Sequence, residues 1–201
     1  MRMDINIKIK ANPARGIFPS YKIELNDRLL EQGTATGDTE LRITADVEEH
    51  NRLRIIHHGK TNRDTVVDQT GKIVEDKSIE IKQISIGGID TLTSLLFMQP
   101  FYVDWPENII KEHSRAGTKP PEFITMNLYL GFNGAYEYKF YGDLDKHRFE
   151  QYWQDEAQAH MNQTKIEQGK EVFERLSNAT DINRDFDLTI HDLARSITDQ
   201  P

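Results

Sequence analysis

Six residues near the C-terminal end of the chain have the spacing of calcium ligands. In the twelve-residue stretch that starts at Asp181, side-chain oxygens occupy positions 1, 3, 5, 9 and 12, and apolar Leu188 stands at position 8. A hard cation such as Ca²⁺ needs oxygens from a loop that wraps around it, and position 7 supplies a backbone carbonyl. The spacing therefore predicts a calcium site made by Asp181, Asn183, Asp185, Asp187, Thr189 and Asp192.

Two positions of this stretch differ from the usual calcium loop. Phe186 stands where glycine makes the sharp turn, and Asp192 stands where a longer glutamate is common. The residues that follow, 193–197, resemble the exiting helix of an EF-hand or a dockerin, and dockerins accept aspartate at the last position. The alternative needs no metal, because Thr189 can cap a helix with Asp192 as its capping-box partner.

Three aromatic residues are candidate ligand contacts. Tyr102 and Trp105 lie in a segment flanked by prolines, and Tyr129 lies on the face of its strand opposite Leu128. Exposed rings can stack on sugar rings. The alternative is that Tyr102 and Trp105 plug one end of the fold, since aromatic residues are more often buried.

The sequence around His57 carries weaker signals. Gly59-Lys60-Thr61 matches the end of a phosphate-binding loop, but Arg54 replaces its first glycine, so we expect no nucleotide site. Neighbouring strand residues point to opposite faces, so His57 and His58 would rarely share a metal ion with Asp64 and Asp68. We expect one histidine to be buried or hydrogen-bonded and the other to be exposed.

No pattern selects a catalytic site. The 33 acidic residues allow any carboxylate pair to be imagined and single out none. A nucleophile elbow and a zinc-protease helix motif are both missing from the sequence. We therefore expect a protein that is not an enzyme.

Most of the first 140 residues alternate between apolar and polar side chains, as half-buried strands do. The alternation predicts strands at 4–11, 20–26, 29–32, 41–45, 53–55 and 78–86. The phase slips between Ile81 and Ile84, which predicts a bulge. Asn133-Gly134 favours a type I′ turn and predicts a β-hairpin over 122–141.

After Gly142 the apolar period becomes helical, and it predicts helix from about residue 145 to 177. We expect a mainly β fold: an antiparallel β-sandwich of jelly-roll type over residues 1–142, followed by a C-terminal α-helical segment over 143–201.

Composition limits the classes of partner. The chain has 201 residues, of which 37% are hydrophobic, and its net charge is −8. An acidic chain without a dense Lys/Arg cluster predicts no nucleic-acid or membrane partner. There are no cysteines, and the N-terminal residues lack the apolar core of a signal peptide, so we expect no secretion through one.

Four segments carry a family resemblance. YKIELND from Tyr21, LRIIHHGKT from Leu53 and DKSIEIKQISIGG from Asp76, with NLYLGFNGAYEYKF from Asn127, resemble small jelly-roll modules of bacteriophage proteins. These modules are similar to carbohydrate-binding modules of the calcium-dependent, xylan-binding type. The resemblance covers residues 4–141 and implies a phage origin, but no sugar or calcium ligand of that family can be matched residue by residue.

Two functions follow as expectations. The first is a non-catalytic structural or interaction protein, a bacteriophage virion or tail-associated component that binds other virion proteins or itself through its sandwich and helical tail. Its location would be the virion or the host cytoplasm. The alternative is a carbohydrate-binding module that recognises a polysaccharide through Tyr102, Trp105 or Tyr129.

Overall fold

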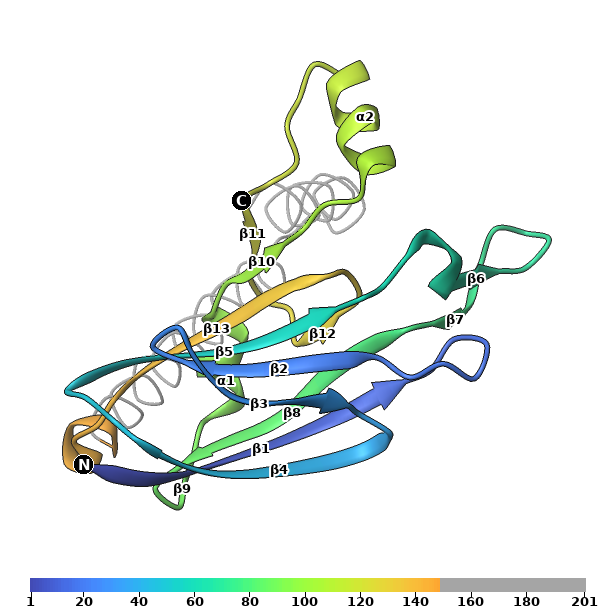
Figure 1. Cartoon of the computed structure of the whole chain (residues 1–201). Coiled ribbons are helices and arrows are strands. Elements are labelled where there is room, and N and C mark those ends of the chain that lie inside the picture. Colours follow the sequence, from blue (N-terminus) through green and yellow to red (C-terminus); the bar gives the residue numbers. More distant parts are fainter. Residues whose placement is uncertain (149–201) are drawn as a thin grey trace, which may run out of the picture. The chain divides into compact units, whose positions relative to one another are not determined.

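The computed structural model describes residues 1–148. The predicted calcium loop and the predicted helical segment beyond residue 148 lie outside the described residues. The described part is a sandwich of two antiparallel sheets, so the expected mainly β, antiparallel sandwich is confirmed (Figure 1).

One layer, the β8 sheet, has the strand order β12-β8-β1-β4, with β9 attached to β8. The strands of the β8 sheet are β1 Arg2–Asn12, β4 Gly37–Asp46, β8 Ser78–Ile86, β9 Ile89–Asp90 and β12 Tyr129–Leu130.

The other layer, the β5 sheet, has the order β11-β10-β13-β5-β2-β3. Its strands are β2 Ser20–Leu25, β3 Arg28–Thr34, β5 His50–His58, β10 Phe101–Val103, β11 Phe123–Ile124 and β13 Gly134–Tyr141.

Smaller elements lie between the sheet strands. A two-stranded hairpin joins β6 to β7, and a 3₁₀ turn precedes it. These elements are the turn Asn62–Asp64, β6 Thr65–Val67, β7 Ile73–Asp76, α1 Thr93–Met98 and α2 Glu107–Arg115.

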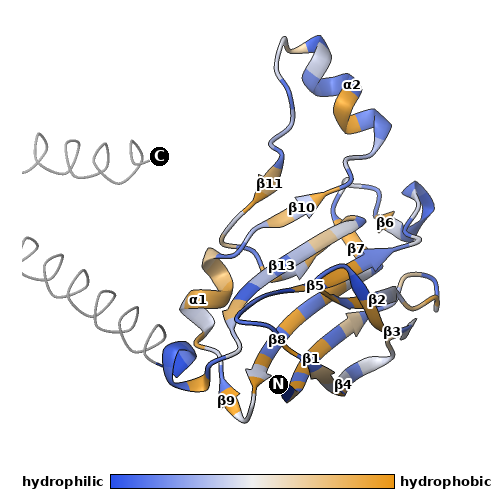
Figure 2. Ribbon diagram, turned by 60° about the vertical axis from the view of Figure 1, so that its left-hand side comes forward, coloured by the Kyte–Doolittle hydropathy of each residue, from blue (hydrophilic) through white to orange (hydrophobic). Residues whose placement is uncertain are grey.

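The core lies between the layers and comes from alternate residues of the long strands. Ile5, Ile7 and Ile9 of β1 are at most 1% exposed, and they face Tyr136, Tyr138 and Phe140 of β13 within one cluster. Along β1 the intervening residues are polar and at least partly exposed, so the strand carries alternating bands of hydropathy (Figure 2). This burial fixes the register, since a one-residue slip would turn every apolar side chain outward.

The predicted bulge in the Ile81–Ile84 stretch is confirmed. Gln83 pairs with Lys8 and Ile81 pairs with Ile9, so Lys82 is the extra residue. The bulge lets Ile79, Ile81, Ile84 and Ile86 all face the core despite the slip in the sequence pattern.

The predicted strands at 20–26 and 29–32 are confirmed, and they form a hairpin. β2 pairs with β3 around Asn26-Asp27, whose φ angles are 51° and 64°. These left-handed values suit a two-residue hairpin turn.

The predicted hairpin over 122–141 is wrong. β12 pairs with β8 in one sheet, whereas β13 pairs with β5 and β10 in the other. Residues 131–133 therefore carry the chain from one layer to the other. Gly134 has a φ of 146°, and a Cβ there would lie 2.2 Å from the carbonyl oxygen of Tyr102. The glycine permits a close approach to β10 and does not form a hairpin turn.

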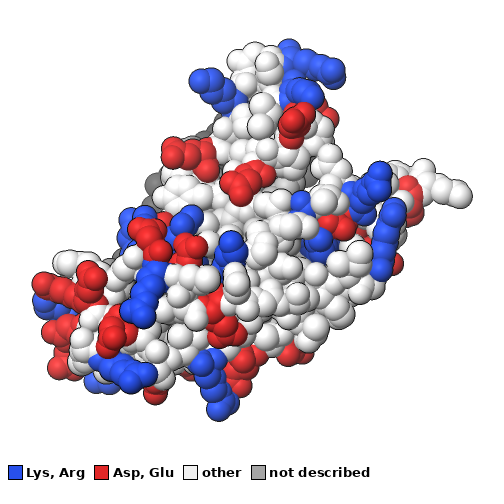
Figure 3. Space-filling model, in the orientation of Figure 1, with Lys and Arg blue, Asp and Glu red and all other residues white. Residues whose placement is uncertain are grey.

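Charge is spread over the surface. On the face shown in Figure 3, acidic and basic side chains lie interspersed and form no basic stripe. Among the described residues, no helix has the length and apolar character needed to cross a membrane.

Candidate functional site

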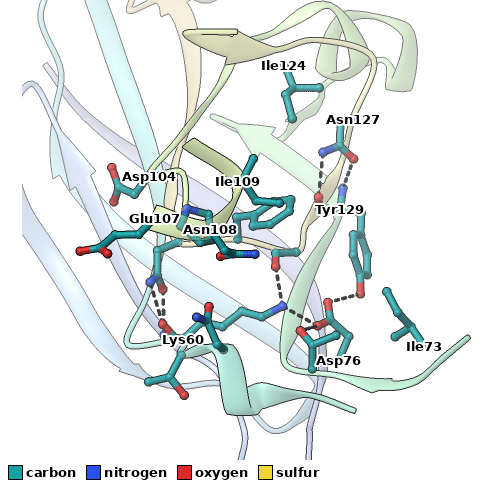
Figure 4. A pocket seen from close by; sticks show the side chains of 17 residues that line it. Lys60, Ile73, Asp76, Asp104, Glu107, Asn108, Ile109, Ile124, Asn127 and Tyr129 are labelled. Atoms are coloured by element: carbon teal, nitrogen blue, oxygen red, sulfur yellow. Dashed lines mark hydrogen bonds and ion pairs between the residues drawn. The ribbon is translucent and has the colours of Figure 1, made fainter. Parts of the chain in front are cut away.

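A cavity of about 850 Å³ opens at one end of the sandwich. Its walls come from the loop after β5, the β6–β7 hairpin, the start of α2, β11 and the residues from 127 to 133 (Figure 4). Its volume lies in the range of sites that bind small molecules.

The loop after β5 is held by buried charges. The Lys77 ammonium lies 2.7 Å from Oδ2 of Asp64 and donates to the carbonyl oxygen of Gly59 at 2.9 Å. Asp64 also accepts from the backbone N–H of Thr61 at 2.7 Å, and together they form a capping box on the 3₁₀ turn. Burial alone would raise the pKa of Asp64, but the bonds from Lys77 and Thr61 leave it lowered. The loop is therefore fixed before any ligand arrives.

A second ion pair lines the cavity itself. Lys60 donates to Oδ1 of Asp76 and to the carbonyl oxygen of Gly131, both at 2.5 Å. Oδ1 of Asp76 also accepts from the Thr65 hydroxyl at 2.5 Å, and its Oδ2 accepts from the Tyr129 hydroxyl at 2.8 Å. The dashed lines of Figure 4 join the Lys60 ammonium, the Asp76 carboxylate and the Tyr129 hydroxyl. Every charge of this pair has hydrogen-bonding partners, as a buried pair requires.

Tyr129 presents a ring to the cavity. The side chain is 42% exposed, while its hydroxyl is fixed on Asp76. Burial of the hydroxyl, with the Asp76 carboxylate beside it, raises the pKa of Tyr129 to about 12. A Cβ on Gly131 would come within 2.8 Å of ring atom Cε1, so a glycine there gives the ring its place.

Two amides hold the backbone of the cavity wall. Asn127 accepts from the N–H of Tyr129 at 2.9 Å and donates to its carbonyl oxygen at 2.8 Å. Asn133 makes the same pair of bonds with the backbone of Lys60, at 2.8 and 2.9 Å. Each amide keeps one N–H and one oxygen lone pair for a ligand.

His57 supports the wall from inside the core. The ring is fully buried, and its Nδ1 lies 3.0 Å from the carbonyl oxygens of both Leu130 and Phe132. The pKa of His57 is lowered to about 4, mainly by burial. The hydrogen bonds to the two carbonyl oxygens act in the opposite direction, and the charge of nearby Lys60 contributes to the lowering. The ring is therefore neutral, with its proton on Nδ1, and it fixes the two residues that flank Gly131.

The three predicted aromatic contacts do not share one surface. Tyr129 lines the cavity. Trp105 is half-buried, lies 5.2 Å from the ring of Phe132 in the cavity wall, and donates from Nε1 to Pro121 at 2.7 Å. Tyr102 packs its ring on Phe123 at 5.7 Å and is not among the cavity residues.

The structure does not assemble a metal site from the histidine region. His57 is buried, His58 lies on the opposite face of β5, and Asp64 is paired with Lys77. Asp68 closes its own turn by accepting from Thr70 and Lys72. In residues 1–148 no group of three or more His, Asp and Glu side chains could hold a metal ion.

Sequence reasoning missed Lys60, Asp76, Asn127 and Asn133 as site residues. The sequence pattern around Lys60 suggests only the end of a phosphate-binding loop, and the pattern around Asn133 suggests only a turn. The available signal was the position of two asparagines on either side of Tyr129, but their backbone bonds depend on a chain crossing that local pattern does not reveal.

The free groups of the cavity are neutral or acidic. Asp104, Asn108 and Asn62 are exposed, and within the described chain their side chains have no hydrogen-bonding partner. Lys60 is neutralised by Asp76, and Glu107 is bound to Lys111 at 3.0 Å. The unpaired groups of the cavity are therefore an aromatic ring face, side-chain amides and the carboxylate of Asp104.

Comparison with known proteins gives two structural likenesses. No family model matches the chain, and no curated protein matches it. The carbohydrate-binding module vCBM60, solved in complex with galactobiose, aligns with a TM-score of 0.42 and 11% identity over 67% of this chain and 95% of that one. Its selenomethionine form, described among calcium-dependent carbohydrate-binding modules linked by circular permutation, aligns with the same score and identity over 67% and 88%. Galactobiose and calcium are ligands named for those proteins.

Proposed function

We propose that this protein is a non-catalytic carbohydrate-binding module that holds a stretch of neutral polysaccharide in the cavity beside Tyr129. The observation that carries the proposal is an exposed aromatic ring, fixed through its hydroxyl, at an open cavity whose other free groups are amides and the carboxylate of Asp104.

The chemistry of a sugar matches this arrangement. A pyranose ring has a face of C–H bonds, which packs on an aromatic ring, and hydroxyl groups around its edge. Each hydroxyl can donate and accept, so Asn and Asp side chains such as Asn108 and Asp104 can bind it. Because Asp76 already holds the Tyr129 hydroxyl, the ring loses little freedom when the ligand arrives.

Charge favours a neutral polysaccharide over an acidic one. The one lysine in the cavity wall is paired with Asp76, and the acidic group of Asp104 remains free. An anionic sugar or a phosphate would meet net negative charge here.

The carboxyl groups support binding without hydrolysis. A glycosidase needs one carboxylic acid whose pKa is raised so that it can protonate the leaving group. Among the described residues of the cavity wall, the Asp76 carboxylate is paired with Lys60 and the Glu107 carboxylate with Lys111, which leaves Asp104 as the one unpaired carboxylate there, whereas a glycosidase uses two. The role of a virion component, and a phage origin, stay predictions.

Affinity gel electrophoresis on neutral polysaccharides, including xylan and galactan, tests the proposal. We expect the wild-type protein to be retarded on at least one of them, and Tyr129→Ala to weaken binding at least tenfold, about 1.4 kcal/mol. Tyr129→Phe keeps the ring but loses the bond that fixes it on Asp76, so its affinity should fall between those of the wild type and Tyr129→Ala.

Phe123→Ala is the matched control, since Phe123 is an aromatic residue of similar exposure, 45%, outside the cavity wall. Equal losses in Tyr129→Ala and Phe123→Ala would contradict the proposal. So would a wild-type protein that runs unretarded on every polysaccharide.

A further inference from the structure

Among residues 1–148, the sandwich has one long and regular edge strand without a second pairing partner, β4. Sheet edges carry unpaired backbone N–H and C=O groups, and proteins usually protect them by shortness, by bulges, by proline or by charged side chains, above all lysine. Edges β11 and β12 are two residues each, and β3 pairs with β2 through a register shift. β4 has ten residues, pairs with β1 without a register shift, and contains neither proline nor lysine.

The two faces of β4 are sharply different. Leu41 and Ala45 are buried under the sandwich, with Thr39 and Ile43 half-buried beside them. Asp38, Glu40, Arg42 and Thr44 alternate with these residues on the outer face and are exposed. Any strand added to this edge must match both faces.

A second β4 matches in one register. When two copies pair antiparallel about Leu41, each Glu40 stands opposite the partner's Arg42, and Asp38 stands opposite the partner's Thr44. Centring on residue 40 would set Glu40 against its own copy, and centring on residue 42 would do the same to Arg42. Pairs centred between residues would set outer positions against inner ones. Opposite charges stabilise directly facing strand pairs, and like charges destabilise them.

The available charges lie where this pairing needs them. The Arg42 side chain is 75% exposed and contacts Glu40 of its own strand at 3.0 Å. Glu40 is also held by the Asn6 amide at 2.8 Å, so its carboxylate is positioned on the outer face. Acidic and basic side chains lie next to each other along the lower margin of Figure 3, where β4 runs in Figure 1.

We propose that β4 is the contact surface of a symmetric dimer, in which two copies of this chain join their β8 sheets into one continuous sheet. The two-fold axis passes through Leu41, and Glu40 and Arg42 of both copies form an alternating square of charge. In the same register Thr39 faces the partner's Ile43 on the inner side, which buries more of the half-exposed Ile43. The proposal is independent of sugar binding.

Sedimentation equilibrium of the full chain from about 1 µM to about 1 mM tests it, because interfaces at the small end of the size range give weak dimers. We expect a monomer–dimer equilibrium in the wild-type protein. Arg42→Glu and Glu40→Arg each set like charges across the axis and should raise the dissociation constant at least tenfold.

Mixing restores the complementarity. In an equimolar mixture of Arg42→Glu and Glu40→Arg, every charge of one copy faces its opposite in the other, so heterodimers should form. The double swap Glu40→Arg/Arg42→Glu should again form homodimers. Thermal melts of each variant verify that the sandwich stays folded, as expected for exposed residues.

Three results would overturn the proposal. The first is a wild-type chain that stays monomeric over the whole range. The second is a dimer unaffected by either single swap, which would use another surface. The third is a mixture of the single variants that stays monomeric.

Discussion

His57 shows how one buried ring can support the wall of a cavity that it does not itself line. Its Nδ1–H is shared between the carbonyl oxygens of Leu130 and Phe132, and the carbonyl oxygen of Gly131 between them accepts from Lys60. Its Nε2 is buried without a hydrogen-bonding partner among the described residues. A proton added at Nε2 would place a charge in the core, near the ammonium groups of Lys60 and Lys77.

The stability of the protein should therefore fall as the pH falls. Burial holds the pKa of His57 at about 4 in the folded state, below its ordinary 6.5. Between these values the unfolded chain binds a proton that the folded chain does not. The contribution of His57 to the free energy of unfolding is thus fully present above about pH 6.5, and roughly 3 kcal/mol of it is lost when the pH reaches 4. Urea unfolding at a series of pH values measures the slope.

His57→Asn separates this effect from other acid effects, since the amide can still donate toward the carbonyls but does not titrate. We expect a smaller slope in the variant. Some slope should remain, because burial also lowers the pKa of His147. Identical slopes in the two proteins would contradict the assignment to His57.

The strands were predictable where one apolar face continues over many residues. β1 and β8 follow the alternation from end to end, and even the bulge at Lys82 left its mark as a slip in phase. The Asn133-Gly134 signal failed because a local turn pattern does not tell which sheet the next strand joins. A glycine is required at position 134 because the backbone of Tyr102, which is distant in sequence, lies too close for any Cβ.

The conformation of the loop after β5 depends on the buried ion pair between Lys77 and Asp64. Lys77→Met would leave the Asp64 carboxylate buried without its counter-charge. We expect a loss of about 3–5 kcal/mol in the free energy of unfolding, measured by urea denaturation. The side chains of Lys77 and Asp64 are only 7% and 11% exposed, so water can compensate little.

Lys82→Met is the matched control, because Lys82 is 45% exposed and its contact with Glu80 lies at the surface. It should change stability by less than about 1 kcal/mol. The double variant Lys77→Met/Asp64→Asn should be less destabilised than the sum of its single changes. Equal effects of Lys77→Met and Lys82→Met would show that the pair contributes nothing to the loop.

For the molecule as a whole, composition and alternation predicted an antiparallel sandwich, and the described residues form one. The site was less accessible to prediction. Of the aromatic candidates, Tyr129 lines the cavity, whereas Lys60, Asp76 and Asn133 reach it from segments up to 73 residues apart. Side chains that meet only through the packing of two sheets leave no spacing in the sequence.

Calcium binding is best tested on the complete chain. The sequence predicts a calcium site at the Asp181–Asp192 stretch, which lies outside the described residues. Native mass spectrometry with calcium should show one bound ion if that prediction is right. Asp181→Asn/Asp185→Asn should lose it, and Asp90→Asn, an exposed change in the sandwich, should keep it. An ion that survives the double change would contradict the loop assignment.

The crossing of the chain from β12 to β13 brings residues of both layers of the sandwich into the cavity wall. Its walls include Tyr129 from the β8 sheet and Ile124 from the β5 sheet, so an occupant touches both layers. A polysaccharide bound there would resist sliding of one layer past the other, because such sliding would break the contacts of the ligand with one of the layers. The sandwich with bound polysaccharide should therefore unfold at a higher pulling force than the empty one. The polysaccharide through which the force is applied would also be what holds the two layers together.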